Sequence, residues 1–160
     1  MTESLRIHIK VNGRPESAEI APNLMLVDFL REHLGLQGTK LACDQGACGA
    51  CTVLLDGRPV TSCLTFAFAA DGADLQTIEG ASRDNGTLSQ VQNALHDCGV
   101  PQCGFCTPGM VMMMEGFARQ DPLPPGQTLE TWMNANLCRC SGYQGFRRAL
   151  DQLANEAGNP

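Results

Sequence analysis

The sequence has 160 residues, of which 43% are hydrophobic and 18% are charged, and its net charge is −6 at pH 7. This length suits one domain or two small ones, and the acidic balance argues against nucleic acid and anionic membranes as partners. Nine cysteines, no secretory signal at the start and no apolar run long enough to span a bilayer predict a cytoplasmic protein that uses its thiols to bind metal.

The first elements of the chain are a predicted hairpin and a helix. Apolar residues alternate with polar ones over residues 5–11, and Asn12-Gly13 predicts a two-residue turn before a second strand that runs to about Ile20. Apolar residues then recur at helical spacing over residues 26–34, and Gly35 is placed to end that helix.

A cysteine-rich loop comes next. Its spacing is C-x4-C-x2-C followed at a distance by a fourth cysteine, which is the plant-type pattern for a [2Fe–2S] cluster, formed here by Cys43, Cys48, Cys51 and Cys63. Gly46 and Gly49 would let main-chain N–H groups approach the sulfurs. Zinc sites favour paired C-x2-C or Cys/His knuckles, and a disulfide needs an oxidising compartment. The loop therefore predicts an iron–sulfur cluster.

The rest of the first half is predicted to complete a sheet. Residues 52–55 read as a strand, Asp56-Gly57 as a second hairpin turn, and residues 58–62 as the returning strand. Residues 64–70 fit either a short helix or a buried strand, and residues 75–78 read as a last strand. Residues 1–78 are thus expected to form a small α+β domain of the β-grasp, plant-type ferredoxin kind.

The second half is expected to be helical. Residues 79–86 read as a linker, and residues 87–160 as an all-α four-helix domain whose cysteines lie at helix junctions. Thr87 and Gln90 suggest a capping box before a helix with a stripe from Leu88 to Cys98. Further helices are expected over about 108–118, 129–136 and 146–154. Proline and glycine break the chain at 121–126, and Ser141 with Gln144 suggests another capping box. The methionines of the second helix, Trp132 and Cys98 are interpreted as core.

Four more cysteines form two pairs in this half. They are Cys103-x2-Cys106 and Cys138-x-Cys140, each beside an expected helix N-terminus, where N–H groups favour thiolates. By spacing alone this set could hold zinc as well as a cluster.

Longer motifs around the cysteines resemble the small iron–sulfur subunit, or N-terminal portion, of the molybdenum hydroxylases, the xanthine oxidase family, which includes aldehyde oxidoreductases and carbon monoxide dehydrogenases. The motifs are C-D-Q-G-A-C-G-A-C-T-V at 43–53, T-I-E-G at 77–80, Q-C-G-F-C-T-P-G-M at 102–110 and N-L-C-R-C-S-G-Y at 136–143. The resemblance implies that Cys103, Cys106, Cys138 and Cys140 bind a second [2Fe–2S] cluster. It also implies that Gln102 and Cys140 contact a molybdopterin cofactor on a separate large subunit.

The same resemblance implies an electron-transfer subunit of a heteromeric oxidoreductase. Electrons would pass from molybdenum on the large subunit through both clusters to FAD on a medium subunit, or to another acceptor. This chain would carry no catalytic residue of its own. An aldehyde or N-heteroaromatic substrate is favoured over a purine, an aromatic thioester or carbon monoxide. A free-standing two-cluster ferredoxin and a redox-sensing regulatory protein are the alternative functions.

Overall fold

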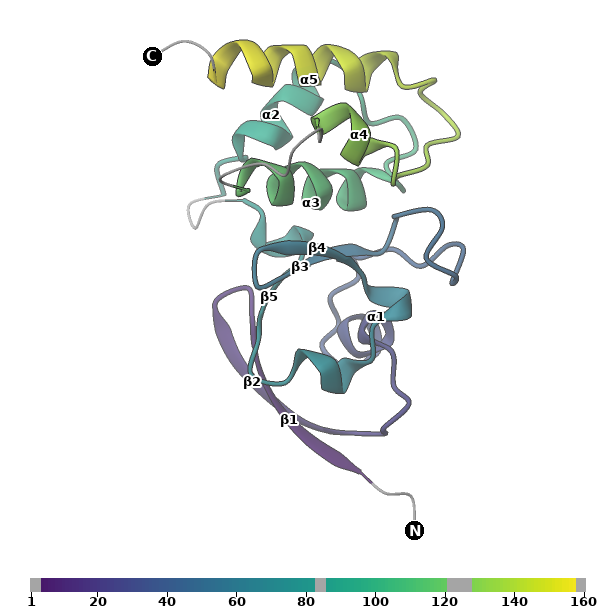
Figure 1. The fold of residues 1–160 in the computed structure, drawn as a ribbon, viewed down its shortest axis with the longest axis vertical. Helices are drawn as coiled ribbons and strands as arrows, with labels where there is room; N and C mark the ends of the chain where they lie inside the picture. The colour runs from purple at the N-terminus through teal and green to yellow at the C-terminus, as the bar shows by residue number, and fades with distance from the viewer. Residues whose placement is uncertain (1–3, 83–85, 121–127, 158–160) are drawn as a thin grey trace.

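A five-stranded mixed sheet forms the N-terminal part of the protein (Figure 1). The structure is a computed structural model, and it describes residues 4–82, 86–120 and 128–157. The strand order is β2-β1-β5-β3-β4. The central β5 runs parallel to β1 and antiparallel to β3, and the two outer strands pair antiparallel with their neighbours. The strands are β1 (Leu5–Val11), β2 (Arg14–Ile20), β3 (Thr52–Leu55), β4 (Arg58–Thr61) and β5 (Asp74–Gln76).

Both predicted hairpin turns are confirmed. Asn12 and Gly13 have φ of 49° and 82°, and Asp56 and Gly57 have φ of 49° and 77°. Positive φ at both central residues is the geometry that matches the twist of the two strands that such a turn joins. The last strand is shorter than predicted, because the N–H of Thr77 donates to Oδ1 of Asn12 rather than to a neighbouring strand.

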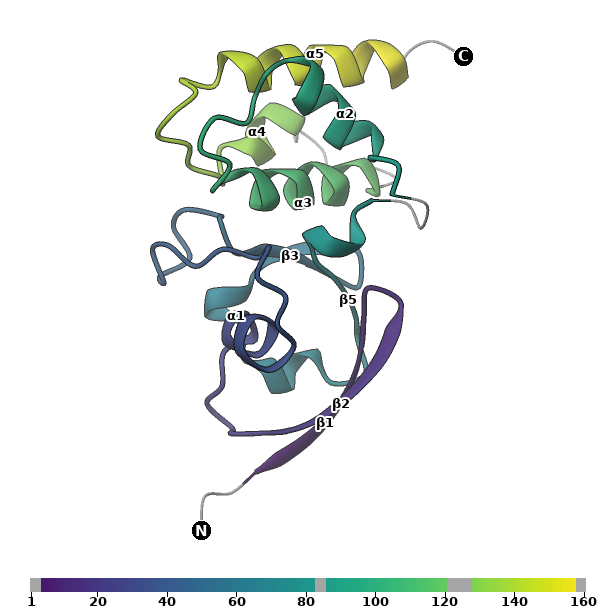
Figure 2. The ribbon, with the colours of Figure 1, turned by 180° about the vertical axis from the view of Figure 1, so that it is seen from behind.

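One face of the sheet is covered by a short helical segment and by two single turns (Figure 2). Helix α1 (Leu26–Asp28) continues as a π-helical turn over Phe29–His33, and Gly35 follows with φ of 68°. The undecided stretch 64–70 is neither one helix nor a strand: it lies in two 3₁₀ turns, Ser62–Leu64 and Ala67–Ala70. The buried core between sheet and helix includes Ile7, Ile9, Leu26, Phe29, Leu30, Val53 and Leu75.

The described residues of the second half contain four helices. They are α2 (Gln90–Asp97), α3 (Thr107–Ala118), α4 (Leu129–Met133) and α5 (Gln144–Ala157). Their core contains Val91, Leu95, Met110, Met114, Met133 and Phe146. The break predicted at 121–126 lies outside the described residues. Trp132 is only half-buried and meets the ring of Phe117 edge-on, with 5.2 Å between centroids.

Two predicted capping boxes are wrong. Helix α2 is capped two residues later than expected, at Ser89. The Ser89 hydroxyl accepts from the N–H of Gln92, and the Gln92 side chain accepts from the N–H of Ser89. Leu88 therefore precedes the helix and is exposed. Before α5, which begins at Gln144, the Ser141 hydroxyl accepts from the N–H of Tyr143 at 3.2 Å and donates to Sγ of Cys138 at 3.1 Å.

Helix α3 joins the two halves, lying between the β3–β4 hairpin and the other helices (Figure 1). Residues 110–114 are all buried, which is typical of a helix covered on every side and confirms the methionines as core. Gly109 and Gly116 permit the close approach: a Cβ at Gly109 would meet the backbone of Gly49 and Ala50, and one at Gly116 would meet Leu54 and Pro59.

The expected linker is anchored at its first residue. The Glu79 carboxylate accepts from the Thr77 hydroxyl at 2.6 Å and from the N–H of Gly38 at 2.8 Å. Residues 83–85 of that stretch lie outside the described residues. Glu79 therefore ties the beginning of the connection to the sheet half.

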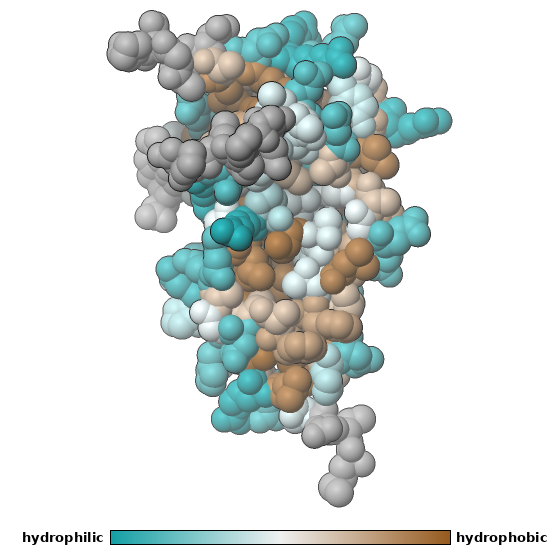
Figure 3. Space-filling view, viewed as in Figure 1, coloured by the Kyte–Doolittle hydropathy of each residue, from teal (hydrophilic) through white to brown (hydrophobic). Residues whose placement is uncertain are grey.

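Apolar side chains gather on the face that carries the 3₁₀ turns (Figure 3). In this part of the chain Leu64, Phe66 and Phe68 are exposed, and the two phenyl rings stack with 5.4 Å between centroids. None of the helices in the described ranges has the length and apolar character needed to cross a membrane.

Candidate iron–sulfur centres

The loop before β3 curls through three left-handed residues. Asp44, Gly46 and Gly49 have φ of 56°, 71° and 69°. This curvature turns main-chain N–H groups inward, and the N–H of Ala47 lies 3.3 Å from Sγ of Cys43. A backbone that wraps its own thiols in this way is suited to an anionic sulfur cluster.

The four thiols of the first set come together in two pairs. Cys43 contacts Cys48, and Cys51 contacts Cys63. The first pair is half-buried at the loop, whereas Cys51 and Cys63 are 2% and 3% exposed beneath it. The 3₁₀ turn Ser62–Leu64 thus brings the distant Cys63 to the loop.

The two pairs differ in how readily their thiols lose a proton. The N–H of Gln45, helped by Cys48, lowers the pKa of Cys43 to about 7. Burial, reinforced by the neighbouring Cys51 thiol, raises the pKa of Cys63 to about 11. Cys43 is therefore readily converted to the thiolate. At the buried Cys63, metal binding must displace a proton.

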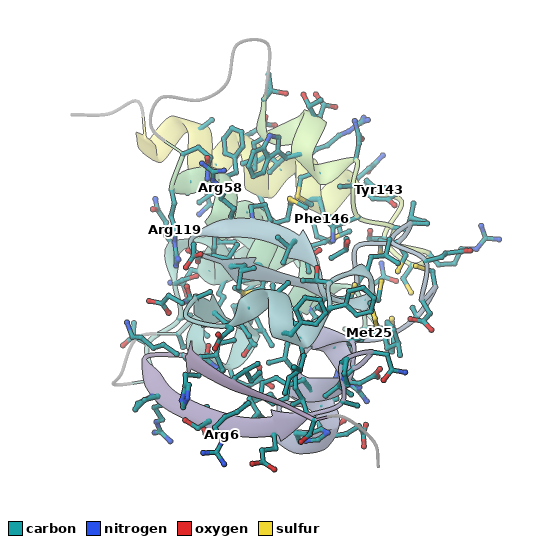
Figure 4. All side chains as sticks on the ribbon, turned by 60° about the horizontal axis from the view of Figure 1, so that its bottom comes forward. Arg6, Met25, Arg58, Arg119, Tyr143 and Phe146 are labelled. Carbon is teal, nitrogen blue, oxygen red and sulfur yellow. The ribbon has the colours of Figure 1, made fainter. Side chains whose placement is uncertain are left out.

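The second set shows the same pairwise arrangement. The Sγ atoms of Cys103 and Cys140 lie 3.5 Å apart at the surface, and Cys106 contacts Cys138 at a half-buried position. Cys103 and Cys106 precede α3, and Cys138 and Cys140 precede α5. Figure 4 shows sulfur atoms gathered on the side of the molecule where Tyr143 is labelled.

In the second set, hydrogen bonds lower the pKa of one thiol in each pair. The N–H of Phe105 lowers the pKa of Cys103, and the bond with Cys103 raises the pKa of Cys140. Burial raises the pKa of Cys106 to about 12. Burial also acts to raise the pKa of Cys138, but the hydroxyl and N–H of Ser141, at 3.1 and 3.4 Å from its sulfur, outweigh burial and lower it.

The donor sets fit a dinuclear cluster better than a single ion. Across the described part of the chain, no three cysteine, histidine or acidic side chains converge as ligands of one metal ion. Zinc would need four donors around one point. In a [2Fe–2S] cluster with four thiolates, each iron takes two of them, which is the pairwise arrangement of both sets.

The remaining predicted residues are placed as follows. Gln102 is exposed beside the exposed Cys103, so its amide is available to a partner. Cys98 lies apart from both sets, half-buried against the helical core, with its sulfur 3.8 Å from Oε1 of Gln152.

Two residues beside the second set have roles that sequence reasoning missed. Asn136 is 1% exposed and contacts the first cysteine loop, and Tyr143 holds Cys138 through its hydroxyl. Both lie within the motif at 136–143, which was the only signal that could have identified them.

Comparisons with known proteins agree with this geometry. Residues 9–77 match a family described as a 2Fe-2S iron-sulfur cluster binding domain, and residues 77–151 match one described as a [2Fe-2S] binding domain. Each match contains one of the two cysteine sets.

Relatives match over nearly the whole chain. The nicotinate dehydrogenase small FeS subunit of Eubacterium barkeri is 39% identical over 94% of this chain and 98% of its own length. The xanthine dehydrogenase iron-sulfur-binding subunit of Escherichia coli O157:H7 is 42% identical over 89% of this chain and 90% of its own.

Solved structures share the fold. A chain of quinoline 2-oxidoreductase from Pseudomonas putida 86 matches with a TM-score of 0.85 at 38% identity, covering 98% of this chain and 99% of that one. Aldehyde oxidoreductase from Desulfovibrio gigas also gives 0.85, at 35% identity, but this chain spans only 18% of it. The protein thus belongs to the small [2Fe–2S] iron–sulfur subunits of the molybdenum hydroxylase family, which transfer electrons within oxidoreductase complexes.

Proposed function

We propose that this chain holds two [2Fe–2S] clusters and conducts electrons between the subunits of a molybdenum-dependent hydroxylase or dehydrogenase. The first cluster is held by Cys43, Cys48, Cys51 and Cys63, and the second by Cys103, Cys106, Cys138 and Cys140. The observation that carries this assignment is the convergence of all eight sulfurs in four pairs. When bound, the clusters supply reversible one-electron chemistry, while this chain positions and insulates them.

Each cluster would have its own domain. We propose a β-grasp ferredoxin domain over residues 1–78, a linker over 79–86 and a four-helix domain over 87–160. The separate apolar cores of the two halves support this division.

A large molybdopterin-binding subunit is the partner proposed for the second cluster. The exposed Gln102 amide and the exposed Cys140 lie on the surface that would face the cofactor. Phe105 and Leu137 flank these residues and are 45% and 58% exposed, so the same surface offers apolar area for a subunit contact. A medium FAD-binding subunit is proposed as the acceptor near the first cluster.

The proposed substrate is an aldehyde or an N-heteroaromatic compound, oxidised on the large subunit. The names of the relatives include nicotinate dehydrogenase, nicotine 6-hydroxylase and an aldehyde oxidoreductase, which support this proposal. They also include xanthine and caffeine dehydrogenases, so a purine is the alternative substrate. The cytoplasmic location expected from the cysteine content stays a prediction.

Metal analysis of the native complex tests the proposal. We expect four irons and four labile sulfides per copy of this chain, together with a co-purifying large subunit. Half that iron with stoichiometric zinc would refute the second cluster, and a chain that purifies alone with both clusters would favour a free-standing ferredoxin.

Two variants test the order of electron flow. In Gln102→Ala both clusters should assemble, while reduction by substrate slows or the molybdenum cofactor is held more weakly. In Cys48→Ser, substrate should still reduce the second cluster, and transfer onward should fail. A Cys48→Ser complex that keeps its molybdenum cofactor but leaves the second cluster oxidised would reverse the proposed order.

A further inference from the structure

Three hydrogen bonds form a closed triangle that begins and ends at Cys138, a cysteine of the second set. The N–H of Cys138 donates to the Tyr143 hydroxyl at 2.7 Å, and the N–H of Tyr143 donates to Oγ of Ser141 at 3.2 Å. The Ser141 hydroxyl in turn donates to Sγ of Cys138 at 3.1 Å, and the N–H of Ser141 lies 3.4 Å from the same sulfur. We call these residues and their bonds the hydrogen-bond triangle.

The triangle determines where the Ser141 hydroxyl directs its hydrogen. A serine hydroxyl has one hydrogen, which rotates to suit its partners, and two acceptor lone pairs. Because the N–H of Tyr143 occupies one lone pair of Ser141, the hydroxyl hydrogen is left to point at the sulfur of Cys138. A hydrogen bond to a ligating sulfur stabilises the more negative, reduced state of an iron–sulfur cluster. The triangle therefore favours reduction of a cluster held by this set.

Helix capping does not explain a tyrosine at position 143. Tyr143 has φ of 64°, in the left-handed region that bulky residues rarely adopt, and it follows Gly142 with φ of 58°. Its carbonyl accepts the first main-chain bond of α5, from the N–H of Arg147 at 3.0 Å, so it occupies a place where serine, threonine, aspartate or asparagine is preferred. Such a strained conformation persists only where the surrounding structure holds it.

The Tyr143 side chain is anchored through both its hydroxyl and its ring. The hydroxyl accepts from Cys138 and also donates to the carbonyl of Asn136 at 3.3 Å. The ring lies against that of Phe146, with 6.1 Å between centroids, and packs on the helical core (Figure 4). These contacts hold the backbone of Tyr143 in the left-handed conformation, which places its N–H on the Ser141 hydroxyl.

We infer that the hydrogen-bond triangle raises the reduction potential of the second cluster, and that Tyr143 is the positioning residue that keeps the Ser141 hydroxyl directed at Cys138. The inference rests on the proposed function. Reduction adds one electron to the cluster and negative charge to its sulfurs, so the O–H bond to Cys138 strengthens, and no proton or further reactant is needed. A higher potential makes the second cluster a better acceptor for electrons that arrive from molybdenum.

The test is a potentiometric titration of the intact complex, in which the paramagnetic resonance signals of the two clusters are followed separately. Ser141→Ala should make reduction of the second cluster about tenfold less favourable, or about 59 mV for a one-electron couple, which is the order expected for one hydrogen bond to a charged group. Tyr143→Phe removes only a hydroxyl and should shift the same potential in the same direction by a smaller amount. In the double variant Tyr143→Phe should add nothing, because its effect passes through Ser141.

Two further variants and an internal reference serve as controls. Ser141→Thr keeps a hydroxyl and should restore the wild-type potential. Gln144→Ala changes an exposed neighbour of Tyr143 outside the triangle and should also titrate like the wild type. The first cluster should keep its potential in every variant. A wild-type potential in Tyr143→Phe, or additive shifts in the double variant, would overturn the inference, since a merely structural role of Tyr143 predicts one or the other.

Failure to assemble is covered by a second substitution. Tyr143→Leu repeats the test if Tyr143→Phe does not hold the second cluster, and it should lower the potential in the same way. Loss of that cluster in both variants, or in Ser141→Ala, would show an assembly role for the triangle and overturn the inference. A wild-type complex that titrates with only one cluster would instead refute the proposed function itself.

Discussion

The contact between α3 and the first cysteine loop makes Gly109→Ala the most informative single substitution. The added Cβ would overlap the carbonyl oxygen of Gly49 and lie 3.1 Å from Cα of Ala50, so it meets backbone rather than a movable side chain. The Gly49 carbonyl cannot retreat freely, because it accepts hydrogen bonds from Asn136 and twice from Thr52. The helix and the loop must therefore separate.

The expected cost follows from these restraints. Overpacking costs about 1–3 kcal/mol in general, and the rigid obstacle puts this site at the upper end. The better helix propensity of alanine returns at most about 1 kcal/mol. A net loss of about 2–3 kcal/mol in the free energy of unfolding corresponds to roughly a 30- to 150-fold larger unfolding constant.

Gly145→Ala provides a matched control for this assay. Gly145 also lies in the first turn of a helix, but there a Cβ would lie 3.2 Å from Cγ2 of Val100 and 3.3 Å from the carbonyl oxygen of Cys98, which are tight contacts rather than an overlap. Loss of cluster absorbance in guanidinium measures the unfolding rate of the loaded chain. We expect Gly109→Ala to lose both clusters far faster than the wild type, and Gly145→Ala to lose them within about fivefold of the wild-type rate, which corresponds to about 1 kcal/mol. Equal behaviour of the two variants would refute the close packing of α3 on the loop.

Three further predictions concern individual side chains. Cys98→Ala should keep both cluster spectra and cost at most about 1 kcal/mol, because only a weak contact with Gln152 is lost; a missing spectrum would show that Cys98 is a ligand. In the cluster-free chain, alkylation of Cys43 should rise about tenfold between pH 6 and pH 8, because its pKa is about 7 and the thiolate reacts. Mass spectrometry should find Cys106 unreacted in that range, since its pKa is about 12, and preferential labelling of Cys106 would contradict this account. Ser141→Ala should lower the reduction potential of the second cluster only, because the O–H bond to Cys138 stabilises the more negative reduced state; Ser141→Thr should restore it in a potentiometric titration.

Local features of the chain could be predicted from the sequence because they depend on neighbouring residues. The turn at Asn12-Gly13 requires only two residues that tolerate positive φ, and the strand before it follows from alternation. The two cysteine sets were also recognisable from local spacing. Three cysteines of the first set lie on a single loop, and the two members of each pair in the second set lie within four residues of each other.

Choices between equivalent local signals were made by the surrounding side chains. Two overlapping capping boxes begin at Thr87 and Ser89, and the helix uses Ser89, whose partner Gln92 also meets Ser82. Ser141 does not cap α5 at Gln144; its hydroxyl bonds to Cys138 and accepts from the N–H of Tyr143. In the first case Ser82, ten residues away, also holds the capping side chain, and in the second the partner lies within the same cysteine loop.

The sequence by itself determined which residues could hold the clusters, because ligand chemistry and loop spacing are local properties. Only the tertiary structure decided how the sulfurs pair and how the two loops meet. The bond from Asn136 to Gly49 joins residues 87 positions apart, and Gly109 is required only because α3 lies against that loop. Such contacts depend on how a helix and a sheet pack together, and no periodicity or turn signal within either segment specifies that packing.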